Sequence, residues 1–217
     1  MSLIKIENIK VTNVARAVYA ARNPMNSWKL SDSDLENDTL GEKDLDLARR
    51  LYKAGTEHAK YLRMIRVTFD MTAPLYLLKE MDTYKVGVNC NSTSTMHKIM
   101  SKPFDIEDFA HDKMSEEDLH NWFYPFIYHL ENLRTLYVNY DDCADIITER
   151  YPTKKDVWYS LIQLLPSSYM QKRTYEMSYQ ALINIIKQRK NHKLEEWHDF
   201  CDTMLDECKY LKDIINV

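Results

Sequence analysis

Glycine is scarce in this chain, and the few glycines form no loop of the kind that binds phosphate. Only 3 of the 217 residues are glycine. The sequence contains neither a Gly-x-Gly-x-x-Gly fingerprint nor a Gly-x-x-x-x-Gly-Lys-Ser/Thr loop, which excludes the Rossmann and P-loop modes of nucleotide binding. A nucleotide would have to be bound by other residues.

Long apolar runs and closely spaced cysteines are also missing. No run approaches the length that spans a bilayer, and the N-terminal residues mix charge with aliphatic side chains, unlike a signal peptide. The four cysteines, Cys90, Cys143, Cys201 and Cys208, lack Cys-x-x-Cys spacing, so neither a disulfide framework nor a structural zinc site is indicated. We expect reduced thiols, a cytoplasmic location and no membrane partner.

The charge balance gives no overall attraction to nucleic acid, because the formal net charge is −4. One stretch of the chain nevertheless has a local excess of basic residues: Lys60, Arg63, Arg66, Lys79 and Lys85. Acidic residues in the same stretch could pair with them: Glu57, Asp70, Glu80 and Asp82. Composition alone leaves both ordinary ion pairing and anion binding open, so it indicates a globular domain that could bind an anion.

Apolar spacing predicts an α+β fold in one domain over residues 1–217, with a small mixed or antiparallel sheet and long helices. Alternation predicts strands at 3–11, 64–71 and within 167–177. Helical periodicity predicts helices at 14–22, 42–54, 74–84, 115–151, 154–165, 179–188 and 194–215, the fourth kinked at Pro125 and the second ended by Gly55. Turn-forming residues predict loops at 23–41 and 85–94.

Two sets of residues suggest other chemistry without making it the favoured interpretation. His192, Glu196 and His198 are ligand types that bind zinc, but they lie in a highly charged segment that is typical of a solvated helix, so we predict no metal. Cys90 lies in the polar loop, but no histidine is adjacent in sequence to act as its base.

A series of motifs resembles the flavin-dependent thymidylate synthases. Residues 55–74 have that family's order of elements: a histidine, a short helix and an aromatic-rich strand. Asn91-Ser92-Thr93-Ser94 then resembles the Asn-Glu-x-Ser core of the signature Arg-His-Arg-x-x-Ser-x-Asn-Glu-x-Ser-x-Arg. Downstream, Leu165-Pro166, Asn184 and Gln188-Arg189 resemble a segment that lines the flavin and nucleotide pocket. With residues 14–19 resembling the first helix, the resemblance covers residues 3–200.

The resemblance implies a homotetramer that binds FAD across subunit interfaces. Such an enzyme uses NADPH and methylenetetrahydrofolate to convert dUMP to dTMP, with no cysteine nucleophile. Two alternatives remain: a flavoprotein of the same fold that acts on another pyrimidine nucleotide, and a non-catalytic nucleotide-binding or assembly protein.

The resemblance also assigns roles to individual residues. It implies catalytic roles for Arg189 and Ser94. The implied FAD-binding residues are His58, Lys60, Arg63, Tyr84, Lys85, Asn91 and Asn184. The implied substrate-binding residues are Lys79, Glu80, Ser92, Ser94 and Arg189.

Several signature positions carry other residues in this chain. Arg-His-Arg falls on Thr83-Tyr84-Lys85, the signature glutamate on Ser92 and the final arginine on Met96. A further family arginine falls on Ile162, while Lys60 and Arg63 replace a threonine and a glutamate. We therefore expect a divergent member whose thymidylate synthesis is weak or whose phosphate site is rearranged.

Overall fold

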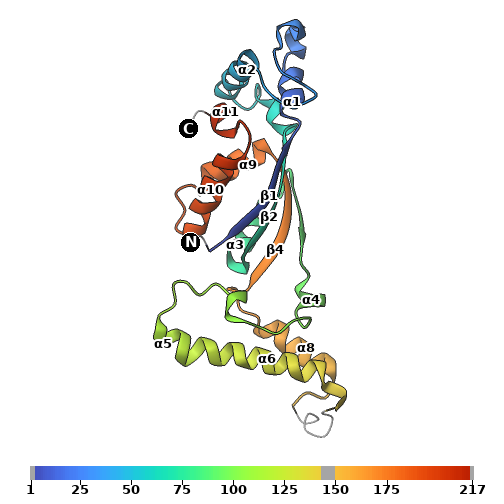
Figure 1. Cartoon of the computed structure of the whole chain (residues 1–217), viewed down its shortest axis with the longest axis vertical. Helices are drawn as coiled ribbons and strands as arrows, with labels where there is room; N and C mark the ends of the chain where they lie inside the picture. The colour runs from blue at the N-terminus through green and yellow to red at the C-terminus, as the bar shows by residue number, and fades with distance from the viewer. Residues whose placement is uncertain (1–2, 143–149, 216–217) are drawn as a thin grey trace. The chain divides into compact units, whose positions relative to one another are not determined.

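The computed structural model describes residues 3–142 and 150–215, which form two compact units (Figure 1). Unit 1 comprises residues 1–72, 80–91 and 173–217, and unit 2 comprises residues 73–79 and 92–172, in each case as far as they are described. The prediction of one domain over residues 1–217 stays a prediction, whereas the predicted α+β class is confirmed.

The strands form one four-stranded sheet in the order β1-β2-β4-β3. Their bounds are Lys5–Thr12 for β1, Arg66–Pro74 for β2, Val88–Ser92 for β3 and Met170–Ser178 for β4. β1 and β2 are antiparallel. In β2 the alternating residues Val67, Phe69 and Met71 are almost fully buried, which confirms the strand predicted from their spacing. The strands predicted near residues 3–11 and within 167–177 are also present.

β3 is the part of the sheet that sequence patterning missed, because residues 85–94 were predicted to be a loop. The strand lies at an edge of the sheet, and its side chains from Asn89 to Ser92 are exposed. The backbone supplies the pairing: Ser178 donates to the carbonyl of Gly87, and Thr93 donates to the carbonyl of Lys172. An edge strand with no buried face carries no alternation of apolar residues to detect.

Unit 1 also contains the helices that cover its core. These are α1 (Val14–Ala20), η1 (Asn23–Met25), η2 (Trp28–Leu30), α2 (Glu42–Lys53), η3 (Lys60–Arg63), α9 (Tyr179–Arg189), α10 (Glu195–Glu207) and α11 (Leu211–Ile215). α9 and α10 lie beside the sheet (Figure 1). The buried Phe200 of α10 contacts Phe69 of β2, with ring centroids 5.9 Å apart.

Two helix ends in unit 1 test the sequence predictions directly. Gly55 has φ +106° just after α2, which confirms that it ends this helix. The single helix predicted over residues 194–215 is wrong. α10 ends at Glu207, and Tyr210, with φ 61°, separates it from α11. No helical periodicity reveals this break, because Cys208 and Leu211 are both buried.

Unit 2 is mostly helical. Its elements are most of α3 (Leu75–Met81), α4 (Thr95–Lys98), η4 (Ile106–Asp108), α5 (Glu116–Asp118), the π-helical turn η5 (Leu119–Phe123), α6 (Tyr124–Val138), η6 (Tyr140–Asp142) and α8 (Lys154–Leu164). Its core is formed by Ile99, Phe109, Ile127, Leu130, Leu133, Val157 and Leu161. The continuous helix predicted over 115–151 is interrupted by η5 and ends at Val138, and residues 143–149 of that prediction lie outside the described residues.

Two prolines lie at the ends of regular elements. Pro74 ends β2, and α3 begins one residue later, so Pro74 is not in the first helical turn. Pro125 lies in the first turn of α6, directly after η5, and the kink predicted there stays a prediction. Over the ranges that the structure describes, no helix is both long and apolar enough to cross a membrane.

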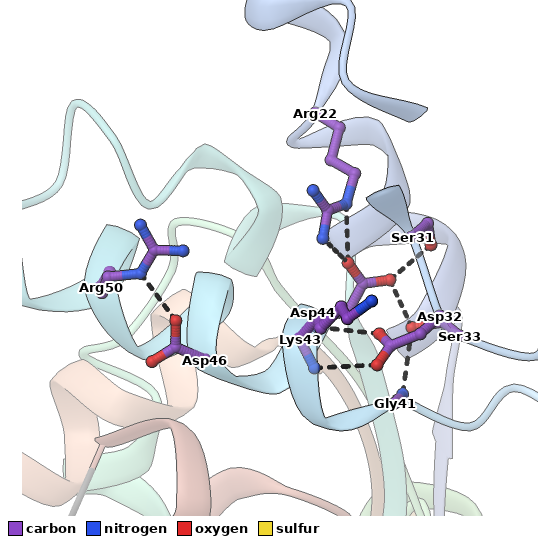
Figure 2. Close-up of polar contacts among 9 residues, drawn as sticks. All are labelled: Arg22, Ser31, Asp32, Ser33, Gly41, Lys43, Asp44, Asp46 and Arg50. Carbon is purple, nitrogen blue, oxygen red and sulfur yellow. Dashed lines mark hydrogen bonds and ion pairs between the residues drawn. The ribbon is translucent and has the colours of Figure 1, made fainter. Parts of the chain in front are cut away.

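The start of α2 is fixed by a set of polar contacts with the preceding loop (Figure 2). The fully buried carboxylate of Asp44 accepts a hydrogen bond from Arg22 Nε at 2.7 Å and from the hydroxyls of Ser31 and Ser33 at 2.5 and 2.6 Å. Asp32 accepts from the amides of Lys43 and Asp44, and so caps the helix from outside it. These contacts order the loop predicted over residues 23–41.

Candidate functional site

The candidate site is built around Arg189, the last residue of α9. This helix begins where the Ser178 hydroxyl accepts a hydrogen bond from the amide of Ala181. Its apolar residues Leu182, Ile183, Ile185 and Ile186 are buried in unit 1. Because these residues fix the rotation of the helix, the exposed Asn184 and the half-buried Arg189 lie off its buried face.

Arg189 contacts three side chains of the same unit, Glu80, Tyr84 and Trp197. Its Nη1 donates to Glu80 Oε2 at 2.9 Å, and its Nε donates to Tyr84 Oη at 2.7 Å. The guanidinium carbon lies 4.9 Å from the ring centroid of Trp197 and 5.5 Å from that of Tyr84. Trp197 Nε1 and His192 Nε2 also face Glu80 Oε2, at 2.9 and 3.5 Å. We call Glu80, Tyr84, Arg189, His192 and Trp197 the Arg189 cluster.

A chain of hydrogen bonds links the Arg189 cluster to Asn184. Tyr84 Oη donates to Gln188 Oε1 at 3.1 Å, and Gln188 Nε2 donates to Asn184 Oδ1 at 3.1 Å. The structure thus brings together four residues that sequence analysis assigned to the site: Glu80, Tyr84, Asn184 and Arg189. Their donors and acceptors form one surface on which a planar polar ligand could be oriented.

A second group of predicted residues lies on and just before η3. Lys60 and Arg63 are exposed on this short helix, and His58 is exposed in the turn before it. Arg63 Nε donates to Gln180 Oε1 of α9 at 2.5 Å, which ties η3 to the helix that carries Arg189. In the part of the chain that the structure describes, Lys60 makes no ion pair. This segment offers solvent-accessible positive charge next to α9.

The remaining predicted residues are spread over both units. In unit 1, Lys85 is exposed before β3, and Asn91 is exposed on β3. In unit 2, Lys79 is exposed on α3, and Ser92 is exposed at the end of β3.

Ser94, assigned a catalytic role by resemblance, has a structural role in unit 2. It is the N-cap of α4, and its hydroxyl accepts from the amide of His97 at 3.2 Å. The contact satisfies one of the amides that a helix N-terminus leaves unpaired. Its predicted part in the reaction stays a prediction.

The residues considered for a metal are used in local hydrogen bonds. His198 Nε2 contacts the carbonyl of His192 at 2.8 Å, and His192 Nδ1 accepts from the amide of Leu194 at 3.2 Å. Glu196 is buried and has a partner. Among residues 3–142 and 150–215, no three side chains of His, Cys, Asp or Glu gather in a geometry that could bind a metal ion.

Two residues of the Arg189 cluster were given no part in this site by the sequence. Trp197 was interpreted only as part of a helix, and His192 was considered only as a metal ligand. One signal in the sequence could have pointed to Trp197. A buried indole N–H needs an acceptor, and the charged residues of this segment indicate that one is at hand. The acceptor itself, Glu80, lies 117 residues away in the sequence, so no local pattern identifies it.

The fold is that of flavin-dependent enzymes whose structures have been solved. Two crystal structures of a flavin-dependent thymidylate synthase from Helicobacter pylori, both with FAD and dUMP, match the chain. One has 17% sequence identity and a TM-score of 0.69, covering 99% of this chain and 97% of that one. The other has 18% identity and a TM-score of 0.66, covering 96% and 97%. At these identities the matches establish the fold.

The family follows from the sequence itself. The family model of thymidylate synthase complementing proteins matches residues 7–211, and the chain therefore belongs to this family, the flavin-dependent thymidylate synthases. The resemblance found in the sequence is confirmed, and the enzyme class is of the methyltransferase type. A comparison with curated proteins finds no match.

Proposed function

We propose that this protein is a thymidylate synthase that methylates dUMP at C5 to give dTMP. The observation that carries the proposal is the family match over residues 7–211, nearly the whole chain. It favours this function over the two alternatives left open by the sequence. In the proposed reaction, methylenetetrahydrofolate supplies the carbon, NADPH supplies the electrons, and the hydrogen at C5 of dUMP is released as a proton.

The described residues fit a flavin and a nucleotide by the chemistry of their donors. Asn184 offers an amide that can pair with the edge of a ring, and the half-buried Tyr84 offers an aromatic ring beside Arg189. Lys60, Arg63 and Lys85 are exposed cations that attract phosphate. When bound, FAD would supply the redox chemistry, while these residues would bind and orient the ligands.

The residues available to bind the phosphate of dUMP in this chain differ in charge from those of the family signature. Met96 and Ile162 stand where two signature arginines are expected. Each charge-assisted hydrogen bond that these arginines would have made contributes about 1.5–3 kcal/mol of binding free energy. Lys79, which is exposed in the same unit as Met96 and Ile162, can restore part of the attraction. Lysine lacks the planar fork of arginine, so orientation is restored less well than attraction. We therefore propose slow turnover.

The proposal also covers the oligomeric state of the protein and its location in the cell. We propose a homotetramer, in which FAD is bound across subunit interfaces, acting in a reducing cytoplasm. The support is the resemblance to the family together with cysteines that form no disulfide among the described residues. Light scattering at micromolar concentration tests the assembly, and a mass of 25.9 kDa, that of one chain, would contradict it.

A tritium-release assay tests the activity. We expect tritium from dUMP labelled at C5 to appear in water only when FAD, NADPH and methylenetetrahydrofolate are all present, at less than about 1 turnover per second. Omitting each component in turn is the control. An absorbance spectrum measured after adding FAD and removing excess reports flavin binding separately. A protein that binds FAD and dUMP but releases no tritium would refute the proposed reaction.

A further inference from the structure

Glu80 is the residue on which the Arg189 cluster converges. Its Oε2 atom accepts from Arg189 Nη1 and from Trp197 Nε1, both at 2.9 Å, and His192 Nε2 lies 3.5 Å away. The three residues that contact Glu80 come from α9, α10 and the segment between them, whereas Glu80 lies near the end of α3. One carboxylate oxygen therefore connects residues that lie far apart in the sequence.

Trp197 keeps Glu80 in place. The Trp197 side chain is fully buried, and an indole N–H is a donor only, so it needs an acceptor inside the protein. If Glu80 swung away to release Arg189, the buried N–H of Trp197 would lose its acceptor, which is costly. Glu80 is therefore a fixed element of the cluster and stays beside Arg189 when a ligand arrives.

Arg189 is in turn fixed by Glu80. The Glu80 contact at Nη1 and the Tyr84 contact at Nε set the plane of the guanidinium, and only 16% of the side chain is exposed. Its Nη2 makes no hydrogen bond to any residue that the structure describes. The Arg189 cluster thus holds the Nη2 amino group in one orientation. This lowers the conformational entropy that is lost when a ligand binds.

We propose that Glu80 is a positioning residue, which orients Arg189 toward the nucleotide without contacting the nucleotide itself. This inference rests on the proposed function. It replaces the substrate-binding role that the family resemblance implies for Glu80. The opposite arrangement is competition, in which Glu80 withholds Arg189 from the phosphate of dUMP.

The substitution Glu80→Gln separates positioning from competition, because the two predict changes of opposite sign. Gln keeps the volume of Glu80 and an oxygen that can accept from Trp197, but it loses the charge that fixes Arg189. Positioning predicts about tenfold weaker binding of dUMP to the FAD-loaded protein, measured by calorimetry. Competition predicts tighter binding, which would overturn the proposal. Tyr84→Phe, which removes the acceptor of Arg189 Nε, provides a second variant with the same expected direction.

A double-mutant cycle tests whether Glu80 acts through Arg189. In an Arg189→Gln background, Glu80→Gln should cause no further loss of dUMP affinity, whereas independent roles would give multiplied losses. The matched control is Asp82→Asn, which neutralises an acid two residues away that pairs with Arg173. It should leave dUMP affinity unchanged in both backgrounds.

An NMR measurement on the Arg189 side chain distinguishes a positioning role of Glu80 from a merely structural one. The Nε–H signal of Arg189 in an NMR spectrum of the free protein should exchange faster with water in Glu80→Gln, while the unfolding midpoint changes little. If wild-type protein binds no dUMP, the proposed function fails and this inference fails with it. If wild type binds dUMP and Glu80→Gln leaves that affinity unchanged, this inference alone is overturned.

Discussion

Asp44 and Asp46 lie two residues apart on α2, yet only one of them is buried. Asp44 is closed off from solvent and paired with Arg22, whose side chain is 7% exposed. Asp46 pairs with Arg50 four residues on, and both side chains are more than half exposed (Figure 2). Two Arg–Asp pairs, each with its aspartate on α2, thus lie in different dielectric environments.

We expect Asp44→Asn to destabilise the protein strongly. Removing one partner leaves the buried charge of Arg22 uncompensated, at a cost of about 3–5 kcal/mol in the free energy of unfolding. Urea denaturation measures this loss. The control Asp46→Asn breaks an exposed pair and should cost under about 1 kcal/mol. Equal losses in the two variants would contradict the buried pairing.

Gly41→Ala should also destabilise the start of α2. A Cβ atom at this position would lie 2.2 Å from Asp32 Cγ and 2.4 Å from the Asp32 carbonyl oxygen. Because the backbone of Asp32 is one of the two obstacles, a side-chain rotation cannot remove the overlap. We expect a loss of about 1–3 kcal/mol in the free energy of unfolding, as for other overpacked sites. An unchanged midpoint in urea would refute this close approach.

The spacing of apolar residues was sufficient to predict most of the fold, but it could not identify long-range partners. Val67, Phe69 and Met71 revealed β2 because each is buried on one face. β3 was missed because its stability comes from backbone pairing with β4. For the site, the family resemblance pointed to Glu80 and Arg189 as separate ligand contacts. Their ion pair depends on how α3 and α9 meet in three dimensions, which no local pattern encodes.

Acid should weaken both units. A hydrogen bond from Arg134 lowers the pKa of Glu131 below its ordinary 4.5, and one from Arg66 does the same for the pKa of Glu176. A depressed folded-state pKa contributes stability that is complete above about 4.5 and is lost as pH falls through the folded value. We expect the urea concentration at the unfolding midpoint to decrease when the pH is lowered below about 4.5. Replacing both residues by Gln should flatten this dependence, and an unaltered slope would exclude these two carboxylates.

Thiol labelling should distinguish the exposed Cys90 from two buried cysteines, Cys201 in α10 and Cys208 at the end of that helix. Burial raises the pKa of Cys201 and of Cys208 to about 12, so neither forms the reactive thiolate at neutral pH. Cys90 is exposed on β3. In a Cys143→Ser variant, we expect Ellman's reagent to modify one thiol in the native protein and the remaining two only after denaturation. Rapid reaction of all three would show that the packing around α10 is looser than described.

The π-helical turn at Leu119–Phe123 has a consequence for how this chain accommodates an additional residue. A π turn contains more residues than an α turn, and such turns occur mostly as single insertions within α-helices. Here the turn comes directly before Pro125, which has no amide to donate to a regular helical turn, and Ile127, Leu130 and Leu133 of α6 still face the core. The π turn therefore accommodates one residue more than an α turn while unit 2 keeps these side chains buried.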